Sequence, residues 1–78
     1  MKEYEYDNFV DLMAELSLNF KGNVVNDQIR LYFNRLKKYK LQAVKRGMDY
    51  LISNRKYNDF PVVGCIKEAI ENSRVFEG

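Results

Sequence analysis

Apolar residues recur at helical spacing in four short segments of this 78-residue chain, and this periodicity restricts the fold more than any other feature. In the first segment, Phe9, Met13, Leu16 and Phe20 follow one another at intervals of three or four residues. That spacing places them on one face of an amphipathic helix. The four stripes predict helices over about residues 7–20, 27–38, 41–53 and 61–74. The expected fold class is all-α, a small bundle of four short helices.

Residues that favour helix ends lie beside these stripes. Asp7 is a fair N-cap for the first helix because its carboxylate can accept a hydrogen bond from a first-turn amide, and Asn26 has the same role for the second. Gly22 can close the first helix in a left-handed conformation. Pro61, the only proline, suits the first turn of the fourth helix. Because the connections are short, we expect neighbouring helices to lie antiparallel around one core.

The length and composition predict a single domain over residues 1–78. A chain of 78 residues is near the low end of what one hydrophobic core can stabilise. Hydrophobic residues make up 46% of it, and the eleven Tyr and Phe side chains bury a large area each. On the third helix, Ala43, Gly47 and Tyr50 lie opposite the main stripe. The two small residues at i and i+4 allow close backbone approach, so a second face of this helix is expected to be buried.

The inventory of reactive side chains favours a noncatalytic protein. There is no histidine and Cys65 is the only cysteine, which excludes the usual Cys/His zinc site, an intramolecular disulfide and a histidine-activated nucleophile. We expect no catalytic residue, no metal and no cofactor. The single cysteine fits a reducing, cytoplasmic location. No apolar run approaches the roughly 18 residues that a membrane span needs, so no membrane partner is expected.

Positive charge is concentrated in the middle of the chain. The net charge is only +2, but residues 28–49 hold seven basic residues and one acidic residue. The stretch "LKKYKLQAVKR", residues 36–46, contains five of these bases and no acid. On a helical wheel the bases spread around the helices instead of forming one stripe that enters a DNA groove. A solvated surface is the simpler interpretation, and nonspecific contact with phosphates is the alternative.

Leu31 does not fit the core stripe of the second helix. It lies about 200° around the helix from Ile29, so the wheel predicts an exposed leucine beside Arg35 and Lys38. Single exposed leucines are ordinary, but an apolar residue next to Arg can also anchor a protein partner. The candidate contact residues for a partner or for phosphates are Leu31, Arg35, Lys37, Lys38, Lys40, Lys45 and Arg46.

Two stretches carry a resemblance to a known family. "YFNRLKKYKLQAVKRGMDYLI", followed by "DFPVVGCIKEAIE", resembles the folded N-terminal domain of the phage helicase loader and inhibitor family. The positions that match its pattern are Tyr32, Leu36, Lys38, Tyr39, Val44, Met48, Leu51, Ile52, Phe60, Pro61, Ile66 and Glu68. Tyr32, Val62 and Cys65 stand where the pattern more often has Trp, Thr or a second Pro, and Glu.

The resemblance implies a noncatalytic adaptor that acts in DNA replication in the cytoplasm of a bacterial host. Such an adaptor binds the replicative helicase or an origin-bound initiator, restrains it and delivers it to DNA. In this family the helicase contact is expected in a tail beyond the folded domain. Two alternatives stay open: a small phage inhibitor of a host protein, such as a CRISPR effector or another defence enzyme, and a nonspecific nucleic-acid-binding module.

Overall fold

The structure is a computed structural model that describes residues 1–22, 24–54 and 58–76. Its elements are the 3-10 helix η1 (Glu3–Glu5) and the α-helices α1 (Tyr6–Ser17), α2 (Asn26–Leu36), α3 (Leu41–Ser53) and α4 (Val63–Phe76). The prediction of an all-α fold, a small bundle of four short helices, is therefore confirmed. Across the described ranges, no helix combines the length and the apolar character needed to cross a membrane.

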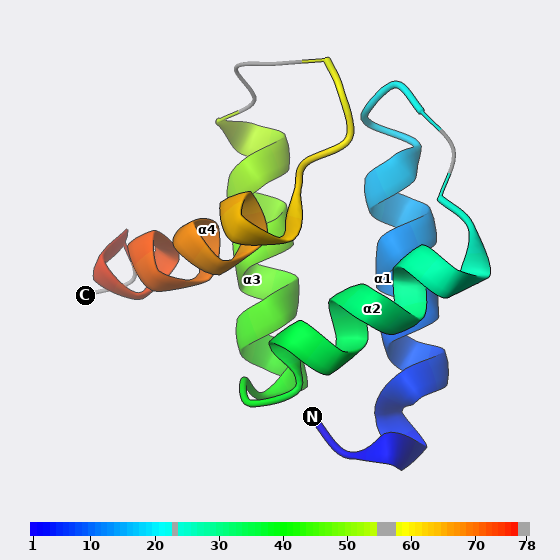
Figure 1. The fold of residues 1–78 in the computed structure, drawn as a ribbon. Coiled ribbons are helices and arrows are strands. Elements are labelled where there is room, and N and C mark those ends of the chain that lie inside the picture. Colours follow the sequence, from blue (N-terminus) through cyan, green and yellow to red (C-terminus); the bar gives the residue numbers. More distant parts are fainter. Residues whose placement is uncertain (23, 55–57, 77–78) are drawn as a thin grey trace.

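The four helices are arranged in two crossing layers (Figure 1). α1 and α3 lie side by side and run in the same direction, whereas α2 and α4 lie across them. The prediction of antiparallel neighbours is wrong, because helices that follow one another in the chain lie in different layers and cross. The resulting shape is flat, with extents of 30 × 27 × 17 Å.

The core lies between the two layers and uses the predicted stripes. α2 buries all four of its stripe residues. Phe33, in the middle of this helix, packs edge to face against Phe9 of α1, with ring centroids 5.5 Å apart. Two positions inside the predicted helix ranges differ: Phe20 lies after the end of α1 and is only partly buried, and Val62 lies before α4 and is 62% exposed. The buried hydrophobic residues are Phe9, Met13, Leu16, Ile29, Tyr32, Phe33, Leu36, Val44, Met48, Ile66, Ala69 and Ile70.

α3 and α4 share the most extensive contact in the molecule, and Gly47 is the reason that they approach so closely. A Cβ atom at position 47 would lie 2.5 Å from Cγ1 of Ile70 and 3.0 Å from its backbone N and Cα atoms. Such distances are too short for any side chain larger than hydrogen. The second buried face predicted for this helix is therefore present, with Gly47 buried and Ala43 partly buried.

The first two helices begin and end differently from the prediction. η1 precedes α1, so Asp7 lies inside the first turn of α1 and does not cap it. α1 ends at Ser17, not at residue 20, and Gly22 takes a positive φ of 112° in the following loop. α2 begins at Asn26 itself and ends at Leu36, two residues earlier than predicted.

Contacts between the two long loops explain the early end of α1. The backbone of Lys21 pairs with the segment before α4: its amide donates to the carbonyl of Asn58, and its carbonyl accepts from the amide of Phe60. The rings of Phe20 and Phe60 pack edge to face, 6.5 Å apart. These partners lie far away in the sequence, so local helix signals could not reveal them.

The start of α4 is fixed by Tyr32 rather than by Pro61. Pro61 is buried, and its carbonyl accepts a 2.9 Å hydrogen bond from the Tyr32 hydroxyl. The helix begins two residues later, at Val63, and the Val62 carbonyl accepts the first amides of the helix, those of Cys65 and Ile66. Pro61 thus precedes the helix instead of occupying its first turn, which also turns Val62 outward.

We expect Tyr32→Phe to lower the free energy of unfolding by about 1–2 kcal/mol, because the buried Pro61 carbonyl loses its hydroxyl donor. Tyr4→Phe is the matched control, since Tyr4 is 83% exposed and its substitution should leave the stability unchanged. Urea unfolding followed by circular dichroism measures both. Equal stabilities of the two variants would contradict a stabilising role for this bond.

Candidate functional site

Four of the predicted contact residues gather where α2 turns into α3. Arg35 lies in the last turn of α2, Lys37 and Lys38 follow it, and Lys40 precedes the first residue of α3. All four side chains are exposed. None of them forms an ion pair with another residue that the structure describes. We call these four residues the basic corner.

The other two predicted bases lie apart from the basic corner. Arg46 is half-buried on the side of α3 that faces α4, and its Nε donates to the Oγ of the buried Ser73 at 3.1 Å. Lys45 is exposed and sits on α3 far around the helix from Gly47, away from α4. The structure thus divides a charge run that is continuous in the sequence.

Leu31 lies on the outer face of α2 and is 50% exposed, as the helical wheel predicts. Arg35 is one turn further along the same face. The opposite face of α2 buries Tyr32, Phe33 and Leu36, so the core of this chain does not use the outer face. Leu31 and the basic corner together are the candidate contact surface, with Leu31 and Arg35 on the outer face of α2 and the other three bases after its end.

The N-terminus holds the basic corner in place. The Met1 ammonium donates to the backbone carbonyls of Lys37 and Tyr39, at the negative end of the α2 dipole. From the other side, the Tyr39 hydroxyl lies 3.2 Å from a carboxylate oxygen of Glu71 in α4. Sequence reasoning missed both contacts because they join residues more than 30 positions apart.

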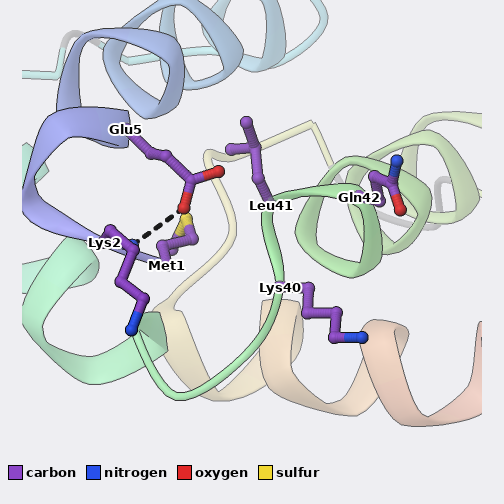
Figure 2. Close-up of a pocket in the computed structure, with 6 residues that line it drawn as sticks. All are labelled: Met1, Lys2, Glu5, Lys40, Leu41 and Gln42. Carbon is purple, nitrogen blue, oxygen red and sulfur yellow. Dashed lines mark hydrogen bonds between the residues drawn. The ribbon is translucent and has the colours of Figure 1, made fainter.

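A shallow depression of about 380 Å³ lies beside this corner (Figure 2). It separates η1 from the start of α3, and the Glu5 carboxylate inside it accepts a 2.8 Å hydrogen bond from the Lys2 amide. Its lining residues are Met1, Lys2, Glu5, Lys40, Leu41 and Gln42. The depression is lined by both charges, from Lys2, Lys40 and Glu5, and defines no ligand class. The exposed surface of Leu31 and the basic corner is therefore the stronger candidate site.

Arg30, also on α2, serves the fold instead of the candidate surface. Its guanidinium forms two hydrogen bonds with the Glu3 carboxylate, 2.7 and 3.1 Å long, and lies 4.9 Å from the centre of the Tyr6 ring. The hydrogen bonds from Arg30 lower the pKa of Glu3, and the positive charge of Lys37 lowers it further. This contact fixes η1 on α2, and the acid partner of Arg30 was not foreseen from the sequence.

The ion pair between Arg30 and Glu3 predicts a loss of stability in acid. A carboxyl whose pKa is lower in the folded than in the unfolded chain stabilises the fold fully above its ordinary value of 4.5. This contribution is lost as the pH falls through the lower, folded pKa. We therefore expect Glu3→Gln to reduce the difference in Tm between pH 7 and pH 3.

The matched control for the acid prediction is Glu15→Gln. Glu15 is exposed and has no ion pair within the described part of the chain, so this variant should keep the pH dependence of the native chain. Because both side chains of the Glu3 pair are largely exposed, the effect should be small and should shrink at high salt. The same acid sensitivity in all three proteins would contradict a role for the pair.

Comparison with protein-family models, with curated proteins and with solved structures finds no match. The resemblance to the phage helicase loader and inhibitor family therefore depends on the quoted residues alone. The structure assigns several of them to packing: Tyr32, Phe60 and Pro61 form the contact that starts α4. These positions inform the fold more than the activity.

Proposed function

We propose that this chain is a noncatalytic protein-binding module, of the kind that binds a replicative helicase or an initiator and holds it in one state. The observation that carries the proposal is the outer face of α2, where the half-exposed Leu31 lies one turn from Arg35, and the other exposed bases of the basic corner follow the end of this helix. None of these bases has an ion-pair partner among the described residues. Arg is enriched at protein interfaces, and a partner can bury the apolar side chain that lies beside it.

The replication role comes from the resemblance, and the lack of histidine supports a noncatalytic protein. An adaptor of this kind acts through differential binding: it stabilises the partner conformation for which it has the higher affinity. A phage inhibitor of a host protein would use the same surface in the same way. The identity of the captured partner separates these two functions.

The test is affinity capture from a host lysate, with the tagged chain as bait and the tag alone as control, followed by mass spectrometry. We expect recovery of the replicative helicase or an initiator. Recovery of a CRISPR effector or another defence enzyme would instead support the inhibitor. A capture that contains only nucleic acid, or no partner at all, would overturn the proposal.

Nucleic-acid binding has its own test, namely fluorescence anisotropy with a labelled single-stranded oligonucleotide. If phosphates bind the basic corner, affinity falls steeply with salt, and the charge reversal Lys37→Glu/Lys38→Glu/Lys40→Glu removes it. We expect no specific binding at physiological salt. Tight binding that the triple variant abolishes would favour the nucleic-acid-binding module.

A further inference from the structure

We propose that the partner presents an acidic segment with one apolar side chain to α2, packing that side chain on Leu31 and placing carboxylates beside Arg35 and Lys38. This inference rests on the proposed function, because it assumes that the chain binds a protein. It adds the position of the interface and the chemistry of the partner.

The geometry of α2 supports an apolar anchor at Leu31. Leu31 and Arg35 are one helical turn apart on the outward face of α2, and Lys38 lies in the turn just beyond the C-terminal end of this helix. In the sequence of α2, the other large apolar residues are all buried: Ile29 is 7% exposed, and Phe33 is fully buried. Leu31 is thus the apolar side chain of this helix that is left for a partner.

The charges on α2 support an acidic partner and indicate which end of the helix its carboxylates contact. Arg30 is neutralised by Glu3, whereas neither Arg35 nor Lys38 has a carboxylate partner among the described residues. The Lys38 ammonium lies 5.2 Å from the centre of the Tyr39 ring. Asp27, in the first turn of α2, places a negative charge at the other end of the helix. Acidic partner residues are therefore favoured beside the C-terminal half of α2 and disfavoured beside its start.

Two features favour a protein over nucleic acid as the occupant. Lys45 and Arg46 lie on other sides of α3, so the bases do not form a track along a phosphate backbone. Tyr39 is half-buried and already bonded, which makes it a poor platform for base stacking.

Photo-crosslinking in cells tests the position of the interface. p-Benzoylphenylalanine replaces Leu31 in one variant and Leu18 in the control, because Leu18 is an 86% exposed leucine at the far end of α1. We expect a protein adduct from position 31 and none from position 18, with the adduct on a partner peptide rich in Asp and Glu. Adducts from position 18 alone, or nucleic acid in the adduct from position 31, would overturn the inference.

Charge reversal tests the chemistry with the captured and purified partner. Arg35→Glu/Lys38→Glu should raise the Kd about tenfold or more, since it places carboxylates against carboxylates. Lys21→Glu/Lys45→Glu changes the net charge equally at exposed sites away from the proposed interface, and should change the Kd less than about twofold.

Different results would contradict the protein-binding function and the position of the interface. If a partner is captured but the two double variants bind it equally, the position and chemistry of the interface are wrong and the binding function stands. If the native chain captures no protein at all, the proposed function and this inference fall together.

Discussion

Leu36→Ala should lower the free energy of unfolding by about 2–5 kcal/mol, because truncation of a core leucine leaves a cavity that the surroundings fill only in part. Leu36 is the last residue of α2, fully buried, and it packs where both layers meet the turn into α3. In a domain of this size such a loss is a large share of the total stability. Urea unfolding at 25 °C, followed by circular dichroism, measures it.

The matched control is Leu31→Ala on the same helix. Leu31 is 50% exposed and should lose less than about 0.5 kcal/mol, as is usual for surface substitutions. The pair therefore tests the register of α2 with one type of substitution. A larger loss at Leu31 than at Leu36 would mean that the helix is rotated and that the proposed contact surface is part of the core.

Gly47→Ala should destabilise the chain by about 1–3 kcal/mol, although alanine is the better helix former. The added methyl group would meet the Ile70 side chain at 2.5 Å and the Ile70 backbone at 3.0 Å. A side chain can rotate away, but the backbone of α4 can move only if the whole helix shifts from α3. Thermal or urea unfolding measures the loss.

Gly64→Ala is the internal control for this prediction. Gly64 also lies in a helix, but nothing is within 4 Å of the position its Cβ would take. Only the gain in helix propensity then remains, so we expect a stabilisation of about 0.5 kcal/mol. If alanine stabilises the chain at both positions, the close approach of α4 to α3 is wrong.

The candidate site was accessible to sequence reasoning only in part. The helical wheel places Leu31 outside and Leu36 inside, and the structure agrees at both positions. The wheel treats each helix alone, however, so it cannot show that Arg46 turns to Ser73 or that Glu71 approaches Tyr39. Which bases stay exposed without an ion pair depends on neighbours that only the folded chain supplies.

The sequence by itself determined the number of α-helices, the face that each of them buries and the close-contact role of Gly47, because helical periodicity and side-chain size are local properties. The tertiary structure decided the helix ends and the two crossing layers. α1 ends at Ser17, and the loop that follows it pairs through Lys21 with the segment before α4. α4 begins after Pro61, whose carbonyl accepts a hydrogen bond from the Tyr32 hydroxyl. Both ends depend on long-range contacts that compete with local helix signals and prevail because they bury aromatic rings and satisfy backbone groups.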